Sequence, residues 1–404
     1  MIYLDFNRTT PLAPSVLEAM QPFWATHFML PGQEHSHAQA VGESLEQARE
    51  SVAGMVGCDP FEIVFTGGGT EANNLAVRGQ FIASSVPGVP GRVASLGKRR
   101  SSLSPGLKSD DKNSATRGHV LVSELEHDSV LAAAFSLHAD GVDVGMVPCQ
   151  ENGIVDPATV ESMLRPDTRL VCLQLANPVL GTLQRVREVA DICHNRGVLV
   201  HCDATQAFGK LPVEVSQLRA DTVSISGHKF YGPKGSGAIY VRRGLHLSPI
   251  SHGEPREMGL RPGAENVPGC IGLGAASHLA SRCESEVSDN FAELSERFLS
   301  GLCSSLSRDP ILLASESPRI ANTMAIEMPC DAVLIQKAAR QLVFATAQSS
   351  EPPDEITRSL KAIGRTETQI RRTMRVSLGW TTSRDQIDRA VSLIAEACDS
   401  VMTR

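Results

Sequence analysis

The sequence predicts an α/β protein, with a mostly parallel β-sheet covered by helices and a smaller α/β domain after it. Between residues 119 and 226, apolar strand-like runs alternate with spans of helical periodicity. Strands of nearly continuous apolar sequence are typical of parallel sheets that are buried on both faces. The chain has 404 residues, which is more than usually fold around a single hydrophobic core, so we expect two domains.

Composition and charge argue against several classes of protein. Hydrophobic residues make up 42% and aromatic residues 4% of the chain, and the net charge is −7. This balance argues against nucleic acid or an anionic membrane as the main partner. The first residues lack the features of a secretory signal, and no apolar run reaches membrane-spanning length. We therefore expect a cytoplasmic protein.

The ten cysteines are scattered and form no C-x-x-C pair. Disulfide frameworks and metal sites need clustered spacing, so we expect reduced, mostly buried thiols and no metal site. Cys172 and Cys202 lie inside apolar strand-like runs and are expected in the core.

The N-terminal part leads to a glycine-rich turn. The chain is predicted to start with an extended segment at 3–11. The spacing of apolar residues predicts helices at 16–28 and 42–56 and a strand at 63–66. The strand continues into Gly67, Gly68, Gly69 and Thr70, and a helix follows from Glu71. Free backbone amides at a positive helix end suit a phosphate group. An ordinary strand-to-helix turn is the alternative.

Residues 84–117 differ in kind from the rest. Serine, proline, glycine and basic residues dominate, including the cluster 98–100. Such a segment cannot bury enough apolar surface to order itself, so we expect a mobile surface insertion. Binding of a partner through the basic cluster is the alternative.

Polar residues gather where the expected strands end. Strands are predicted at 119–123, 142–147, 169–175, 198–204 and 221–226, with helices at 129–138 and 186–196. Ligand groups in such sheets collect at the carboxyl ends of the strands. Four of these ends carry polar side chains: Glu126 and His127, Asn177, Asp203 and Gln206, and Ser226, His228 and Lys229.

Lys229 is the chemically most informative residue of this group. It lies between the strand 221–226 and a second predicted strand at 238–241, beside Ser226 and His228. A lysine held there is placed to be desolvated, and a desolvated lysine loses its proton readily and can attack a carbonyl to form an imine. A solvated loop lysine is the alternative.

The C-terminal part reads as a smaller α/β domain. A turn-rich segment at 253–263 is followed by a long predicted helix at 272–306. Three strands are predicted at 320–328, 342–346 and 375–378, and a closing helix at 385–401. We place the domain boundary near residue 255. We expect three parts. Residues 1–14 form an N-terminal segment that joins the small domain, residues 15–254 form the large domain, and residues 255–404 form the small domain.

Five runs carry a resemblance to a known family, at 66–74, 126–129, 201–206, 226–235 and 375–379. They resemble, in order and spacing, the cysteine desulfurase and selenocysteine lyase group of class V, fold-type I pyridoxal-phosphate (PLP) enzymes. The resemblance covers the chain from Tyr3 to its end, apart from the insertion. It implies a PLP-binding large domain, an amino-acid substrate and a homodimer with active sites at the interface.

The resemblance implies roles for four residues around the cofactor ring. Lys229 would form the Schiff base with PLP and later move the substrate's α-proton. Asp203 would pair with the ring nitrogen and keep it protonated. His127 would stack on the ring as the second catalytic residue, and Gln206 would bond the ring's phenolic oxygen.

The resemblance also implies sites for the cofactor phosphate and for the substrate. The phosphate would be bound by Thr70, Ser226 and His228, with help from the amide at Gly69. Arg375 would grip the substrate carboxylate as a fork. A surface or ion-paired arginine is the alternative for Arg375.

The chain also departs from the family pattern. Desulfurases carry a cysteine on a small-domain loop that attacks the substrate's sulfur. The corresponding loop, 344–354, has no cysteine, and Ser349 aligns at that position. A hydroxyl is a far less acidic group than a thiol. Pro178 stands where the family has an asparagine that donates to the ring oxygen. Ala264 lacks a hydroxyl that in the family reaches the partner subunit. Arg8 replaces a small alanine of the family pattern.

Three hypotheses follow from these matches and departures. The first is an ordinary desulfurase or selenocysteine lyase that supplies sulfur to an acceptor or iron–sulfur assembly protein. The second, which we favour, is a PLP enzyme acting on cysteine or a related amino acid by β-lyase, aminotransferase or other chemistry that needs no loop cysteine. The third is a non-catalytic paralogue that serves as a partner in sulfur metabolism.

Overall fold

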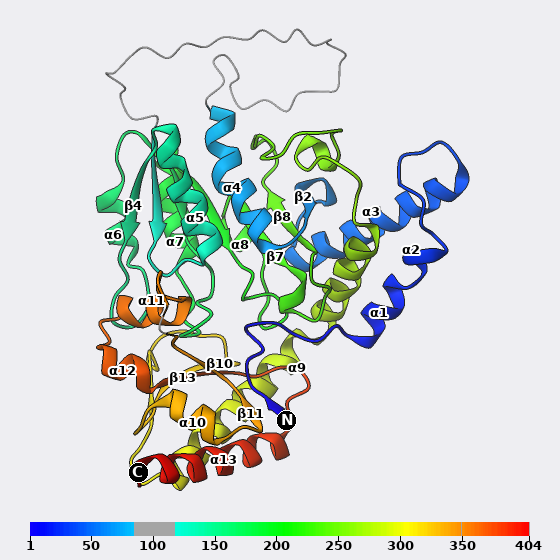
Figure 1. The fold of residues 1–404 in the computed structure, drawn as a ribbon. Helices are drawn as coiled ribbons and strands as arrows, with labels where there is room; N and C mark the ends of the chain where they lie inside the picture. Colours follow the sequence, from blue (N-terminus) through cyan, green and yellow to red (C-terminus); the bar gives the residue numbers. More distant parts are fainter. Residues whose placement is uncertain (85–117, 349, 404) are drawn as a thin grey trace.

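The computed structural model describes residues 1–84, 118–348 and 350–403 (Figure 1). All but the first residue of the expected insertion at 84–117 lies outside the described residues, as does Ser349. Within the described part of the chain, no helix combines the length and the apolar character that a membrane span requires.

A seven-stranded sheet forms the centre of the larger unit and confirms the predicted fold class. Its strands run in the order β2-β8-β7-β6-β5-β3-β4. Only β8 runs against the others, because its ladders with β7 and β2 are antiparallel while the remaining ladders are parallel. The bounds are β2 Ile63–Thr66, β8 Gly237–Val241, β7 Thr222–Ser226, β6 Leu199–Asp203, β5 Thr168–Cys172, β3 His119–Ser123 and β4 Asp143–Val147.

Helices cover both faces of this sheet, because side chains of alternating positions point to opposite faces. Leu121 and Val171 pack with α6 (Pro157–Met163) and α7 (Val186–His194) on one face. Val120, Leu170 and Cys172 pack with α4 (Gly69–Ser84) and α5 (Asp128–Ser136) on the other. Short helices complete the unit: η1 Pro60–Glu62, η2 Leu137–Asp140, α8 Val215–Leu218, η3 Gly227–Lys229 and η4 Glu257–Gly259. Cys172 and Cys202 are buried as predicted.

The N-terminal helices differ from the sequence prediction at their ends. The helix expected at 16–28 is two helices, α1 (Pro14–Met20) and α2 (Pro22–Ala25), because Pro22 cannot donate the next helical hydrogen bond. The helix expected from residue 42 begins at Ser36 as α3 (Ser36–Val56). The His35 side chain caps it by accepting from Ala38 N, and Gly57 ends it in the left-handed region.

The smaller unit contains a four-stranded antiparallel sheet, β12-β13-β10-β9. The strand expected at 342–346 is divided into β11 and β12, and β11 pairs in parallel with β1 of the N-terminal segment. The bounds are β1 Ile2–Tyr3, β9 Ile311–Leu312, β10 Thr323–Glu327, α10 Ala332–Ala338, β11 Leu342–Val343, β12 Ala345–Thr346, α11 Glu355–Ala362, α12 Glu367–Arg372, β13 Thr373–Ser377 and α13 Arg384–Met402.

Helix α9 (Val267–Ser305) is shared between the two cores (Figure 1). Leu273 and Ala276 near its start belong to the apolar cluster of the large sheet. Phe291 and Phe298 farther along belong to the cluster of the small sheet. The division into 1–14, 15–254 and 255–404 stays a prediction, and this packing leads us to propose a boundary inside α9 instead of near residue 255.

Candidate active site

A cavity of about 590 Å³ opens at the carboxyl ends of the parallel strands. It lies where polar residues were expected to gather, since these strand ends share one edge of the sheet. The structure brings together eight of the predicted site residues on its wall: Gly69, Thr70, His127, Asp203, Gln206, Ser226, His228 and Lys229. Its volume falls in the usual range for a small-molecule site.

Lys229 projects from η3, directly after β7. Its Nζ donates hydrogen bonds to the backbone oxygens of Asn7 at 2.7 Å and Arg8 at 3.2 Å. Burial lowers the pKa of this amine from 10.5 to about 8, and the charge of Glu355 opposes the shift only in part. The amine is therefore far more often unprotonated near neutral pH than an ordinary lysine.

Asp203 ends β6 and remains ionised at the cavity wall. Burial on its own would raise the pKa of its carboxyl. Hydrogen bonds from Thr205 and Asn73, together with the charge of His127, outweigh burial and hold the pKa below the ordinary value. Asn73 Nδ2 donates to Asp203 Oδ2 at 2.8 Å, and Thr205 N donates to Oδ1 at 2.9 Å.

His127 is joined to the same network through Ser129. Ser129 N donates to His127 Nδ1 at 3.1 Å, which makes His127 the cap of α5. Asn73 Nδ2 also donates to Ser129 Oγ at 2.8 Å. Asn73 therefore holds both the ring of His127 and the carboxylate of Asp203 in place. Sequence reasoning did not single out Asn73, although it lies inside the run 66–74.

The turn after β2 is shaped to bind an anion. A Cβ atom at Gly69 would lie 2.9 Å from Thr205 Cγ2 and 3.3 Å from Ser226 Cβ, so the wall closes tightly around this glycine. Gly68 has φ of 141°, a conformation that favours glycine. The sixteen-residue helix α4 begins at Gly69, and its first residues, Gly69 and Thr70, line the cavity, so the positive end of the helix lies at the cavity wall.

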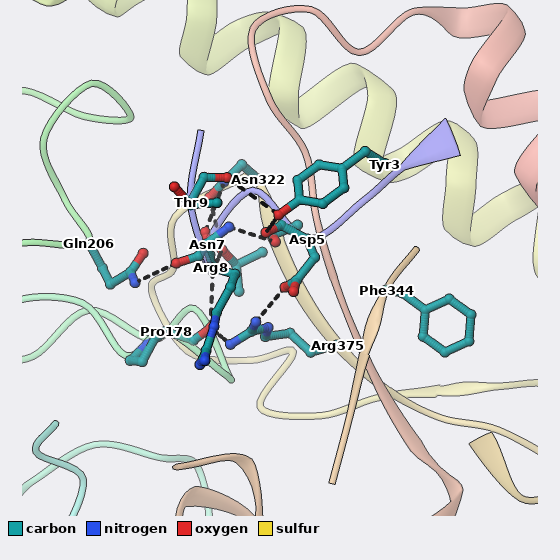
Figure 2. Close-up of polar contacts among 12 residues, drawn as sticks. Tyr3, Asp5, Asn7, Arg8, Thr9, Pro178, Gln206, Asn322, Phe344 and Arg375 are labelled. Atoms are coloured by element: carbon teal, nitrogen blue, oxygen red, sulfur yellow. Dashed lines mark hydrogen bonds and ion pairs between the residues drawn. The ribbon is translucent and has the colours of Figure 1, made fainter. Parts of the chain in front are cut away.

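Asn7 connects the N-terminal segment to both units and was missed by sequence reasoning (Figure 2). Its backbone oxygen accepts from Gln206 Nε2 at 3.1 Å as well as from Lys229. Its side chain accepts from Lys210 Nζ at 2.9 Å and donates to the backbone oxygen of Pro178 at 3.0 Å. Lys210 Nζ also donates to Gln206 Oε1 at 2.7 Å, which fixes the orientation of that amide.

Arg375 is placed differently from the other predicted residues (Figure 2). Its side chain is buried, and Nη2 forms an ion pair with Asp5 of the N-terminal segment. Nη1 donates to the Pro178 oxygen at 3.4 Å, and Nε has no hydrogen-bond partner within the described chain. Among the described residues that line the cavity, Arg375 is absent, whereas Pro178 is present.

Among the other residues that line the cavity are Arg8 and Glu355, to which sequence reasoning assigned no role in binding. Arg8 contributes a cationic side chain, and Glu355 contributes a carboxylate from the start of α11. Oxygen Oε1 of Glu355 is buried without a partner in the described part of the protein. Sequence spacing gave no signal for Glu355, because only the packing of the small unit against the large one brings it to the cavity.

A family model for class V aminotransferases matches residues 2–84 and 107–390. The chain belongs to this family. Cysteine desulfurase from Homo sapiens is 32% identical over 403 residues, covering 96% of this chain and 80% of that protein. Cysteine desulfurase IscS from Rickettsia akari is 32% identical over 411 residues, covering 99% and 92%. The resemblance expected from the sequence is confirmed.

Comparison with solved structures agrees with this assignment. A NifS-like protein superposes with a TM-score of 0.85 at 27% identity and covers 99% of both chains. SspA in complex with cysteine gives a TM-score of 0.76 at 30% identity, covering 94% of this chain and 99% of SspA. The protein is thus a cysteine desulfurase-like enzyme of the class V family, with the fold of type I PLP enzymes.

Enzymes of this family depend on PLP, and the residues of the cavity fit that cofactor. The tight glycine turn at Gly69 suits its phosphate, and the ionised carboxylate of Asp203 suits a protonated ring nitrogen. The amine of Lys229 has the lowered pKa that covalent attachment needs. These three features meet on one cavity wall.

Proposed function

We propose that this chain binds PLP covalently through Lys229 and acts on cysteine or a related amino acid, by β-lyase or other chemistry that needs no loop cysteine. The observation that carries the proposal is the amine of Lys229, with its pKa of about 8, in the same cavity as the ionised Asp203. Bound PLP supplies an electron-withdrawing ring that stabilises negative charge at the substrate's α-carbon.

The remaining site residues would bind and orient the cofactor and the substrate. We propose Thr70, Ser226, His228 and the amide of Gly69 for the phosphate. Burial lowers the pKa of His228 to about 4, so its ring is neutral and can donate a hydrogen bond without adding charge.

We propose that His127 stacks on the ring and that Gln206 orients its oxygen. Both side chains line the cavity, and both are held by hydrogen bonds within the protein. Arg375 remains our proposed anchor for the substrate's α-carboxylate. Its unpartnered Nε supports this role, since a buried donor without a partner favours an anion.

The position of Cys330 gives further support for a reaction without a loop thiol. Cys330, the cysteine nearest in sequence to the loop 344–354, is separated from it by α10 and β11. Its side chain is only 9% exposed, and burial raises the pKa of its thiol. A buried, protonated thiol is a poor nucleophile. We therefore propose that turnover of cysteine is slow and releases free sulfide by elimination.

A product screen tests the proposed function. Purified protein loaded with PLP would be incubated with cysteine and related amino acids, and pyruvate, alanine, sulfide and selenide would be measured. Pyruvate with free sulfide supports a β-lyase. Alanine with protein-bound sulfur supports the ordinary desulfurase. Lack of any product, together with lack of an absorbance band that borohydride bleaches, supports the non-catalytic paralogue.

We predict that PLP attachment depends on pH through Lys229. The amine must be unprotonated to attach, and its unprotonated fraction rises about tenfold per pH unit below the pKa. The attachment rate should therefore rise up to a pH of about 8 and then level off. Rapid-mixing absorbance of cofactor-free protein with PLP measures this profile. A rate that still climbs toward pH 10.5 would show an ordinary lysine.

We also propose a homodimer. In addition to the family resemblance, α1, α2 and the segment after them expose Leu17, Trp24 and Phe28, by 55%, 66% and 69%. Large apolar side chains exposed so close together in the sequence favour contact with another chain. Light scattering should give the mass of two chains. The mass of a single chain throughout a dilution series would contradict the proposal.

A sulfur-acceptor or iron–sulfur assembly protein stays a proposed partner. It belongs to the alternative in which the chain is an ordinary desulfurase, because only protein-bound sulfur needs an acceptor.

A further inference from the structure

Arg8 presents a free cationic side chain at the cavity. It lines the cavity and is exposed. Within the described part of the protein, its guanidinium group forms no hydrogen bond or ion pair. Arg375, by contrast, is buried and paired with Asp5. Of these two guanidinium groups, Arg8 is therefore the one with all of its donors available to a ligand.

The backbone of Arg8 is fixed beside the reactive amine, although its side chain is free. Arg8 O accepts from Lys229 Nζ at 3.2 Å, and Arg8 N donates to Asp5 O at 2.9 Å. The next residue, Thr9, contacts His228 Nδ1 through its hydroxyl at 3.1 Å. The guanidinium is close enough that its charge helps to lower the pKa of both Lys229 and His228.

The two carboxylates that line the cavity, those of Asp203 and Glu355, form no described ion pair with Arg8. Asp203 accepts hydrogen bonds from Asn73, Thr205 and Ser224. Glu355 lines the same cavity, and its buried Oε1 has no hydrogen-bond partner in the described part of the chain, so this oxygen does not pair with Arg8. The guanidinium group of Arg8 can therefore bind a carboxylate or a similar planar anion in the cavity through two parallel hydrogen bonds.

We propose that Arg8 binds an acidic group on the side chain of the amino-acid substrate. The inference rests on the proposed function, in which Arg375 binds the α-carboxylate and Lys229 carries the cofactor. A second anion on the substrate pairs with the second arginine. A substrate with a neutral side chain leaves Arg8 unpaired, so the site distinguishes acidic from neutral amino acids of the same size.

L-Aspartate and L-asparagine are suitable probes because they have the same shape and differ in charge. Their dissociation constants would be measured on PLP-loaded protein by calorimetry and by the change in cofactor absorbance. Wild-type protein should bind L-aspartate at least roughly tenfold more tightly than L-asparagine. Arg8→Ala should lower this ratio to about one by weakening L-aspartate alone, and Arg8→Lys should keep part of it.

Arg187→Ala is a matched control, because it removes the same charge from an exposed position on α7 that is not among the described residues lining the cavity. It should keep the full ratio. Equal binding of both probes by wild-type protein, or an unchanged ratio in Arg8→Ala, overturns the proposal. Equal weakening of both probes in Arg8→Ala also overturns it, since Arg8 would then bind the α-carboxylate.

The proposed function is checked on the same samples by reduction with borohydride. If cofactor is attached to Lys229 and the probes are not distinguished, only the inference about Arg8 fails. If no cofactor is attached to Lys229, the proposed function fails and the inference fails with it.

Discussion

Lys229→Ala protein will carry no covalently fixed cofactor after incubation with PLP and reduction with borohydride, whereas wild-type protein will carry a pyridoxyl group on Lys229. The amine lines the cavity and has a pKa of about 8, so it can reach the cofactor's aldehyde and attack it near neutral pH. Peptide mapping by mass spectrometry locates the label. Turnover of amino acids should fall by roughly a thousandfold or more, because attachment and proton transfer both depend on this amine.

Two other lysines make this prediction specific. Lys234 lines the same cavity, and Lys210 is buried next to Gln206. Burial and the charge of Lys229 hold the pKa of Lys210 well below its usual value. Lys234→Ala should leave the label on Lys229. A label found on Lys210 or Lys234 in wild-type protein would refute our assignment of the reactive lysine.

Ser349→Cys protein given cysteine will gain a persulfide that wild-type protein does not form. Five residues lie between position 349 and Glu355, which lines the cavity. A thiol introduced there is ionised to a few per cent at neutral pH, whereas a serine hydroxyl is almost never ionised. Intact-protein mass spectrometry should show one added sulfur, and alanine should join pyruvate among the products.

The double variant Ser349→Cys, Lys229→Ala is the control, because the persulfide needs a substrate activated at Lys229. It should show no added sulfur from cysteine. Cys330→Ser checks the remaining candidate near the loop. If wild-type protein given cysteine already forms a persulfide, and the Cys330→Ser variant forms it at the same rate, another residue supplies the thiol. That result would show that our interpretation of the loop 344–354 is wrong.

Much of the fold and of the cavity was determined by the sequence alone. Apolar strands separated by helical spans predicted the mostly parallel sheet, since only residues buried on both faces give continuous apolar runs. Asp203, Ser226 and Lys229 follow directly after such strands, and parallel strands end at one edge. Their meeting at one cavity was therefore predictable from local sequence. The absence of a cysteine from residues 344–354 was likewise visible without a structure.

The partners of these residues were decided by tertiary structure. The contacts of Asn7 with Lys229, Lys210 and Pro178 join positions about two hundred residues apart. The pair of Asp5 with Arg375 spans nearly the whole chain. No local pattern encodes such contacts, because they depend on how the N-terminal segment packs between the two units. For the same reason the sequence indicated Arg375 for the substrate carboxylate, but only the structure showed that this residue also pairs with Asp5. Only the structure showed, too, that the Arg8 side chain lines the cavity without an ion pair to any described residue.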